Sequence, residues 1–237
     1  MSEGVVIVTG AAAGLGQVYC RELTAAGYTV VGADLREAAE VELSVVTDVT
    51  SRQETERLAA AVLERFGRID ALVNNAAYYS AIVKRPFEEI EDDEWTTVFD
   101  VNVRGTWLCT AAVAPAMRRQ RKGKIVNVSS MTVPTAPPGF AHYVASKAAI
   151  VGLTRALARE LGPDGISVNT LTPDYIAFDR DYDNRQADMA PTLAAQRILA
   201  REQKPEDMIG ALKFLIGSGS DFVTGQNIWV NGGRAFN

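Results

Sequence analysis

The chain contains 237 residues, of which 47% are hydrophobic and 22% charged, and its formal net charge is -5. This length and composition favour one globular α/β domain over residues 1–237, rather than two small ones, and exclude a chain that is disordered throughout. The acidic balance lacks the basic surface with which proteins bind nucleic acid, so no nucleic-acid partner is expected.

The N-terminal segment leads directly into a predicted strand. The residues before it are too few and too acidic for a signal peptide, and no apolar run reaches the roughly 18 residues of a membrane span. We therefore expect a soluble cytoplasmic protein that does not bind membranes. The β-branched run over residues 4–9 predicts a strand that is buried on both faces.

Three glycines, Gly10, Gly14 and Gly16, follow this strand and precede a helix predicted over residues 18–26. Glycines at a strand-to-helix turn let the backbone approach a pyrophosphate, and the helix N-terminus offers unpaired N–H groups. The spacing differs from the commoner G-x-G-x-x-G fingerprint, and a plain tight turn is the alternative. The position after the first strand favours a dinucleotide site.

Asp34 ends the second predicted strand, residues 28–33. A carboxylate there accepts hydrogen bonds from the adenosine ribose and repels a 2′-phosphate, which favours NAD over NADP. Arg36 is the counter-evidence, because its guanidinium could neutralise that phosphate. The few residues before the third strand, 41–47, leave no room for a crossover helix, so we predict a turn there.

Asp48 and Val49 end the third strand and are placed to flank an adenine. Residues 50–51 offer an N-cap for the next predicted helix, and Gly67 ends that helix. A strand over residues 69–73 then leads to an Asn-Asn-Ala-Ala turn and two tyrosines.

Asn102 is a poor helix former in the apolar middle of a long predicted helix. A buried asparagine needs partners, so we expect it to hold water or a kink. The acidic run before this helix and the basic run after it match a helix dipole, and we interpret both runs as structural.

A fifth strand over residues 124–128 leads to Ser130, and a proline-rich loop then precedes a helix from Tyr143 to residue 161. The polar segment over residues 174–204 has the profile of a flap over a site. The other expected elements are a strand over residues 166–171, a helix over 206–216 and a strand over 226–230.

Tyr143 and Lys147 are four residues apart on one helix, so their side chains share a face. An ammonium beside a phenol in a site without water would lower the phenol pKa from about 10 to about 7, which requires about 4 kcal/mol. The spacing alone is more often that of surface neighbours. The glycine turn and Ser130 favour the catalytic interpretation.

The single histidine, His142, and two distant cysteines, Cys20 and Cys109, do not make a zinc site, and no metal is expected. We interpret the cysteines as buried thiols of a reducing compartment, with a disulfide as the minor alternative. His142 is interpreted as a packing or rim residue rather than a catalyst.

Together these motifs resemble those of the short-chain dehydrogenase/reductase family over nearly the whole chain. The motifs are Thr9-Gly10-x3-Gly14-x-Gly16, Asp48-Val49, Asn74-Asn75-Ala76, the helix around Asn102, Ser130 and Tyr143-x3-Lys147. The resemblance implies a single Rossmann-type domain, which is a three-layer αβα sandwich around a seven-stranded parallel sheet.

By this resemblance, Tyr143 is the general acid/base, Ser130 orients the substrate oxygen, and Lys147 holds the nicotinamide ribose and depresses the Tyr143 pKa. Asn102 seats a proton-relay water. The residues implied to contact the dinucleotide are Gly10, Gly14, Leu15, Gly16, Asp34, Leu35, Asp48, Val49, Asn75, Ala76, Tyr143, Lys147, Pro173 and Ile176.

The chain departs from the family pattern at four positions. Ala77 and Val133 stand where the family has glycines, which indicates a modified pocket wall. Asp174 replaces the glycine of a Pro-Gly turn, and Phe178 replaces a threonine that often holds the nicotinamide amide. The Ile176 backbone is therefore the expected nicotinamide contact.

We expect an NAD-dependent oxidoreductase that interconverts a secondary alcohol and a ketone. Aromatic and apolar residues favour a cyclic or aryl small-molecule substrate over a sugar or a charged acid. The residues expected to bind it are Ser130, Tyr143, Tyr79, Met131 and Tyr175.

Two other functions stay open. One is an NADP-linked 3-oxoacyl or polyketide ketoreductase that uses Arg36, and the other is a dinucleotide-binding sensor without turnover. The intact set of Ser130, Tyr143 and Lys147 speaks against the sensor. The apolar circumference of the Tyr143 helix predicts a homotetramer or homodimer through that helix.

Overall fold

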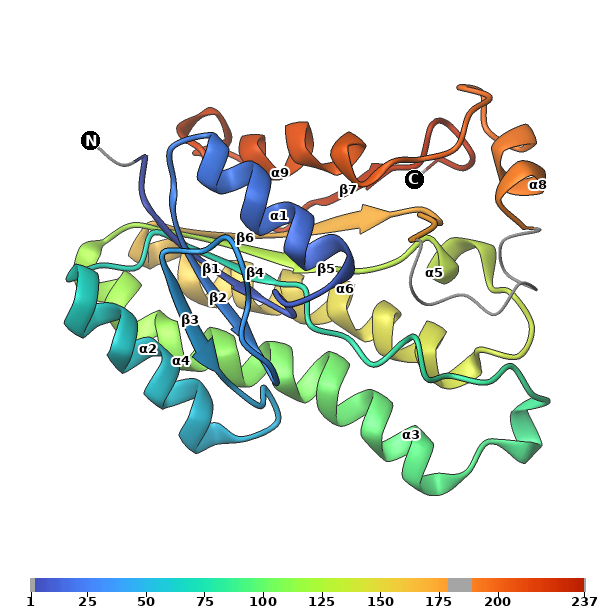
Figure 1. Ribbon diagram of the computed structural model, residues 1–237, viewed down its shortest axis with the longest axis horizontal. Helices are drawn as coiled ribbons and strands as arrows, with labels where there is room; N and C mark the ends of the chain where they lie inside the picture. Colours follow the sequence, from blue (N-terminus) through green and yellow to red (C-terminus); the bar gives the residue numbers. More distant parts are fainter. Residues whose placement is uncertain (1–2, 179–188, 237) are drawn as a thin grey trace.

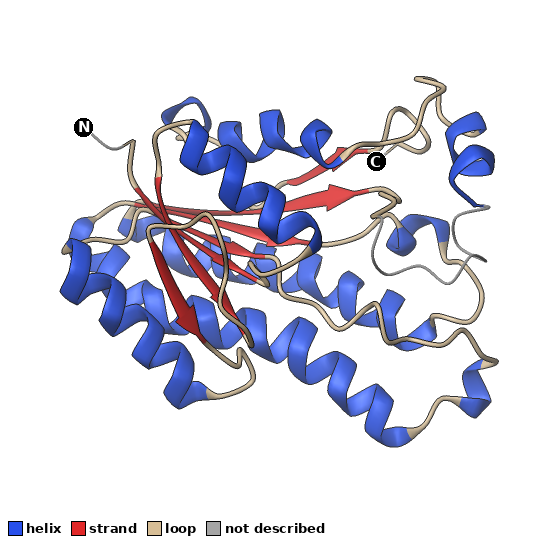
Figure 2. Cartoon of the chain, viewed as in Figure 1, coloured by secondary structure: helices blue, strands red, loops and turns tan. Residues whose placement is uncertain are grey.

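The computed structural model describes residues 3–178 and 189–236 of the chain. Within these residues, parallel strands form one central sheet, and helices cover both of its faces (Figure 1, Figure 2). The strand order is β3-β2-β1-β4-β5-β6-β7, which confirms the predicted seven-stranded Rossmann-type sheet. The strands are β1 Val5–Thr9, β2 Thr29–Asp34, β3 Leu43–Val46, β4 Ala71–Asn74, β5 Gly123–Val128, β6 Ile166–Pro173 and β7 Asn227–Val230.

The helices lie in two layers around this sheet. The α-helices of the described residues are α1 Gly14–Ala25, α2 Arg52–Phe66, α3 Asp92–Phe99, α4 Gly105–Gln120, α5 Thr132–Thr135, α6 Ala141–Leu161, α8 Met189–Ala195 and α9 Ile209–Ile216. Short 3-10 turns occupy Phe87–Glu89, Gly162–Asp164, Pro205–Met208 and Ser218–Ser220.

Two hydrophobic clusters fill the spaces between the sheet and the helices. Because successive strand residues point to opposite faces, neighbours in β1 enter different clusters. Ile7 belongs to the cluster that contains Val62 of α2, whereas Val8 belongs to the one that contains Tyr19 of α1 and Leu212 of α9. Burial on both faces explains why β1 is a continuous apolar run.

Capping residues determine two helix boundaries. Helix α2 begins after Ser51, whose side chain accepts a hydrogen bond from the backbone N–H of Glu54, and it ends at Gly67 with a φ of 72°, as predicted. Helix α1 begins at Gly14, four residues earlier than predicted, because the end of the glycine turn already adopts helical structure. Residues 35–42, between β2 and β3, contain no helix, which confirms the predicted turn.

Asn102 lies in a π-helical turn, Asp100–Arg104, that joins α3 to α4. Its Oδ1 accepts a hydrogen bond from the backbone N–H of Tyr78 at 2.8 Å, and its Nδ2 donates to Ser146 Oγ of α6 at 3.0 Å. The predicted local irregularity is therefore a π-turn. The buried side chain links the loop after β4 to the helix that carries Tyr143.

The carboxyl ends of β1, β4, β5 and β6 lie next to one another at one edge of the sheet, because these strands are parallel neighbours. The chain leaves β1 toward α1 on one face and leaves β4 toward α4 on the other. Such a reversal opens a crevice outside the strand ends, where ligands of doubly wound sheets bind.

None of the described helices combines the length and the apolar character needed to cross a bilayer.

Cys20 and Cys109 are both buried and free, which confirms the interpretation as buried thiols. His142 is fully buried, and its Nε2 lies 3.1 Å from Glu94 Oε1. The packing role predicted for this histidine is thereby confirmed.

Candidate active site

The glycine turn brings backbone against backbone at the end of β1. Gly10 has a φ of 66°, and a Cβ atom there would lie 2.8 Å from Ala76 Cα. A Cβ atom on Gly16 would overlap the carbonyl oxygen of Gly10. No side chain caps the N-terminus of α1, and its first turn contains no acidic residue. The N–H groups and positive dipole of this helix end are therefore placed to bind a phosphate.

Asn75 and Thr9 hold this turn against the end of β4. Asn75 Nδ2 donates hydrogen bonds to the carbonyls of Thr9 at 3.0 Å and Gly10 at 3.3 Å. Thr9 Oγ1 accepts from the backbone N–H groups of Asn75 and Ala76, both at 3.0 Å. Asn75 thus positions the glycine turn while it lines the adjoining cavity.

Asp34 lies at the carboxyl end of β2, directly beside the glycine turn. Its Oδ2 accepts a hydrogen bond from the backbone N–H of Ala12 at 3.0 Å, and its Oδ1 accepts from the backbone N–H of Arg36 at 3.3 Å. The carboxylate therefore has a fixed place next to the phosphate-binding turn, whereas Arg36 is exposed. Asp48 Oδ1 accepts from the backbone N–H and Oγ1 of Thr50, both at 2.8 Å.

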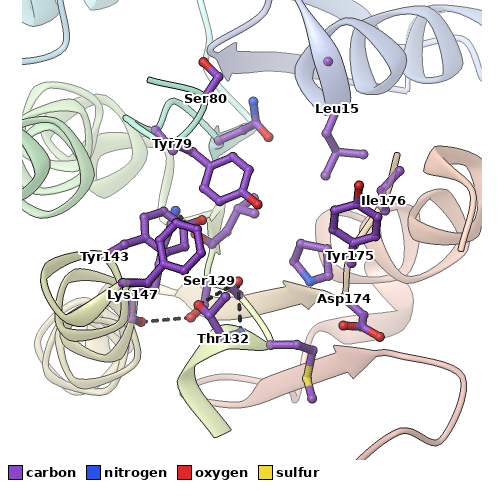
Figure 3. Close-up of a pocket in the computed structure, with 18 of the residues that line it drawn as sticks. Leu15, Tyr79, Ser80, Ser129, Thr132, Tyr143, Lys147, Asp174, Tyr175 and Ile176 are labelled. Atoms are coloured by element: carbon purple, nitrogen blue, oxygen red, sulfur yellow. Dashed lines mark hydrogen bonds between the residues drawn. The ribbon is translucent and has the colours of Figure 1, made fainter. Parts of the chain in front are cut away.

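Tyr143, Lys147 and Ser130 line the same cavity as the glycine turn. Tyr143 is in the first turn of α6, one turn before Lys147, and Ser130 follows β5. Lys147 Nζ donates to the carbonyl of Val128 at 2.9 Å and lies 5.8 Å from the centre of the Tyr143 ring. Ser129 Oγ donates in return to the Lys147 carbonyl at 2.9 Å. These bonds fix α6 to the end of β5 (Figure 3).

Burial dominates the electrostatics of this group. It raises the pKa of the Tyr143 hydroxyl well above its ordinary value; Tyr79 raises that pKa further, and a hydrogen bond with Ser130 lowers it. Burial also lowers the pKa of Lys147 to about 8. The polypeptide alone therefore does not lower the Tyr143 pKa as expected, because the loss of water is the largest influence on it.

The cavity collects most of the residues predicted for the site. Those that line it are Gly10, Gly14, Leu15, Asn75, Ala76, Tyr79, Ser130, Met131, Tyr143, Lys147, Pro173, Tyr175 and Ile176. Six predicted residues lie outside its lining, namely Gly16, Asp34, Leu35, Asp48, Val49 and Asn102. Of these, Gly16 packs against the turn, Leu35 is exposed and Asn102 is buried behind the loop that carries Tyr79.

Aromatic side chains form much of the cavity wall. The ring centres of Tyr79 and Tyr143 are 5.0 Å apart, and those of Tyr79 and Phe140 are 6.2 Å apart. In Figure 3, these two tyrosines lie on one side of the cavity, and Tyr175 and Ile176 lie on the other. Phe140 was not predicted, although its place just before the Tyr143 helix was a usable signal.

Other residues that line the cavity were not predicted from the sequence. Lys84, Thr132, Leu193 and Arg234 belong to this group. Leu193 and Arg234 are far from the motifs in sequence, so no local pattern could reveal them. The predicted flap, residues 174–204, contributes both Tyr175 and Leu193, although its residues 179–188 lie outside the described part of the chain.

Asp174, which lines the cavity, forms buried ion pairs with Arg197 and Arg234. Arg197 Nε donates to its Oδ2 at 3.0 Å, and Arg234 Nη1 donates to its Oδ1 at 2.7 Å. The side chains of Asp174 and Arg197 are 1% and 2% exposed. Arg197 Nη2 also donates to the carbonyl of Tyr175 at 3.0 Å. The acid that replaces the family's glycine thus joins the flap to the C-terminal loop.

A family profile described as enoyl-(acyl carrier protein) reductase matches residues 10–235. This chain belongs to the short-chain dehydrogenase/reductase family. A 3-oxoacyl-[acyl-carrier-protein] reductase FabG of Staphylococcus aureus is 33% identical over 240 residues, which cover 96% of each chain. The FabG of Thermotoga maritima is 35% identical over 243 residues, covering 97% of this chain and 96% of the relative.

Two solved structures have the same architecture. A putative gluconate dehydrogenase from Agrobacterium tumefaciens has a TM-score of 0.88 and 30% identity, covering 98% of this chain and 96% of its own. Levodione reductase has a TM-score of 0.88 and 26% identity, covering 99% and 98%. This short-chain dehydrogenase/reductase is therefore an oxidoreductase that acts on CH–OH groups of small molecules with a nicotinamide dinucleotide. The narrow glycine cradle and the α1 N-terminus fit such a cofactor.

Asp174→Asn should reduce the free energy of unfolding by about 3–5 kcal/mol, because it leaves buried Arg197 without its counter-charge. Asp164→Asn is the matched control, since Asp164 also pairs with two arginines, Arg118 and Arg121, but on the surface. That variant should lose less than about 1 kcal/mol. Urea unfolding measures both values, and equal losses would show that burial does not govern the Asp174 pair.

Proposed function

We propose that this short-chain dehydrogenase/reductase uses NAD to interconvert a secondary alcohol and a ketone, with Tyr143 as general acid/base. The observation that carries the proposal is the meeting of Tyr143, Ser130 and Lys147 with the glycine turn around one cavity. A proton donor and a phosphate cradle in one crevice are the two requirements of coupled proton and hydride transfer.

Each residue has a separate task in this reaction. In reduction, Ser130 and Tyr143 donate hydrogen bonds to the substrate carbonyl oxygen, and Tyr143 gives it a proton as the carbonyl carbon receives hydride. In oxidation, the alcohol proton passes to Tyr143 as hydride leaves the carbon. The bound nicotinamide supplies or accepts that hydride. Lys147, with a pKa of about 8, is mostly cationic at neutral pH and favours the ionised phenol.

The fixed carboxylate of Asp34 supports NAD over NADP. It lies beside the glycine turn through its bond to Ala12 N–H, where it would repel a 2′-phosphate. An NADP-linked 3-oxoacyl reductase stays the second candidate, because the relatives at 33% and 35% identity are named 3-oxoacyl-[acyl-carrier-protein] reductase. Arg36 is the residue that would serve it.

The aromatic wall supports a cyclic or aryl substrate. Tyr79, Phe140 and Tyr175 present flat surfaces around the reacting residues, and Met131 adds an adaptable apolar contact. A ring-shaped ketone can stack on these surfaces. One of the solved structures with this fold is itself named as a reductase, namely levodione reductase.

We further propose that the protein assembles as a homotetramer or homodimer through α6. Trp95 of α3 and Trp107 of α4 are 43% and 42% exposed, and both helices pack against α6. Burial of such surface favours association. A monomeric mass in sedimentation would contradict this assembly.

Tyr143→Phe should reduce the rates of oxidation and reduction by at least about 100-fold. Phenylalanine has no hydroxyl with which to exchange a proton with the substrate oxygen. The dissociation constant for the dinucleotide should stay within about twofold. Steady-state kinetics and fluorescence titration measure the two quantities. Retention of most of the activity would refute the role of Tyr143, and a wild-type protein that binds dinucleotide without any turnover would favour the sensor.

Asp34→Ser should raise the ratio of NADP to NAD efficiency by about tenfold or more, because it removes a fixed charge that repels the 2′-phosphate. Arg36→Ala is the control and should change that ratio less than about threefold. The measurement is kcat/KM with each cofactor. An unchanged ratio in Asp34→Ser, or a large change in Arg36→Ala, would indicate that Arg36 selects the cofactor. That outcome would favour the 3-oxoacyl reductase.

A further inference from the structure

Thr132 makes two hydrogen bonds to one atom of the proposed catalytic serine. Its backbone N–H donates to Ser130 Oγ at 3.1 Å, and its Oγ1 donates to the same oxygen at 3.0 Å. Thr132 is the first residue of α5 and lies at the cavity (Figure 3). The turn between the two residues therefore presents a pair of donors to a single hydroxyl.

This arrangement determines what the serine can do. A serine hydroxyl has one proton and two lone pairs. With both lone pairs engaged by Thr132, the hydroxyl of Ser130 keeps only its proton for the cavity. That proton is left for Tyr143 or for a substrate oxygen. Hydrogen bonds that form a chain polarise one another. The two bonds from Thr132 therefore make the Ser130 hydroxyl a stronger hydrogen-bond donor.

Another threonine of the same helix shows that this contact is specific. Thr135 Oγ1 donates to the carbonyl of Met131, four residues earlier, at 2.7 Å. That bond is the ordinary one for threonine in a helix. Thr132 instead directs its hydroxyl to a side chain of the reacting group. Packing of the helix alone does not require this choice.

We propose that Thr132 is a positioning residue that keeps Ser130 a hydrogen-bond donor toward the reacting oxygen. This inference rests on the proposed function, in which Ser130 and Tyr143 share that oxygen. Thr132 touches neither the hydride nor the transferred proton and acts through Ser130. Its effect should extend to the acidity of Tyr143, because a hydrogen bond with Ser130 lowers the pKa of that phenol.

Thr132→Val keeps the shape of the side chain and removes only the Oγ1 donor. We expect kcat to fall about fivefold, the usual effect of one neutral hydrogen bond. The ionisation seen in the pH profile of alcohol oxidation should move to higher pH. Thr132→Ser restores the hydroxyl and should return both values to those of the wild type. Thr135→Val, the matched control, should leave that ionisation at its wild-type pH.

A second measurement does not depend on turnover. The ionisation of Tyr143 is followed by ultraviolet difference absorption in the presence of NAD⁺, with Tyr143→Phe as the reference. Thr132→Val should shift it to higher pH, and Thr132→Ser should not. Equal titrations for the wild type and Thr132→Val would overturn the proposal, and so would an equal shift in Thr135→Val. Absence of turnover with every alcohol would refute the proposed function, while the titration still decides the role of Thr132.

Discussion

The hydrogen bond from Lys147 Nζ to the carbonyl of Val128 is the contact on which the site depends. It joins the long helix α6 to the end of β5, and Ser129 Oγ strengthens the joint by donating to the Lys147 carbonyl. One turn away on the same helix, Tyr143 then faces the cavity beside Ser130. A lysine buried in this way is costly unless it is hydrogen-bonded. The bond from Lys147 to Val128 also fixes the position of the Tyr143 phenol on the same helix.

Polar side chains at the cavity and behind it extend this constraint to the other loops. Asn75 ties the end of β4 to the glycine turn, and Asn102 ties the next loop to α6. Asp174 ties the flap to the C-terminal loop through Arg234. Each of these side chains forms hydrogen bonds to two segments and so sets the distance between them. Ser130, Tyr143 and Lys147 thus stand at a strand end and on a helix, which limits how far their side chains can move relative to one another.

Most of the fold could be predicted, and so could the meeting of Ser130, Tyr143 and Lys147 at one cavity, because strand burial, helix caps and a four-residue spacing are local patterns. The buried partners could not be. Arg197 and Asp174 are 23 residues apart, and Arg234 is 60 residues from the same acid, so only the folded chain joins them. The direction of the Tyr143 pKa was also missed. Spacing places an amine beside the phenol, but it does not measure how much water both groups lose.

The claim that Lys147 sustains the acid/base work of Tyr143 is tested most directly by the pH dependence of alcohol oxidation in Lys147→Met. Methionine fills nearly the same space without a charge or a donor. We predict a rate at neutral pH that is at least about 100-fold lower, with the ionisation that controls it moved to higher pH. A profile that coincides with that of the wild type would contradict the proposed coupling between the amine and the phenol.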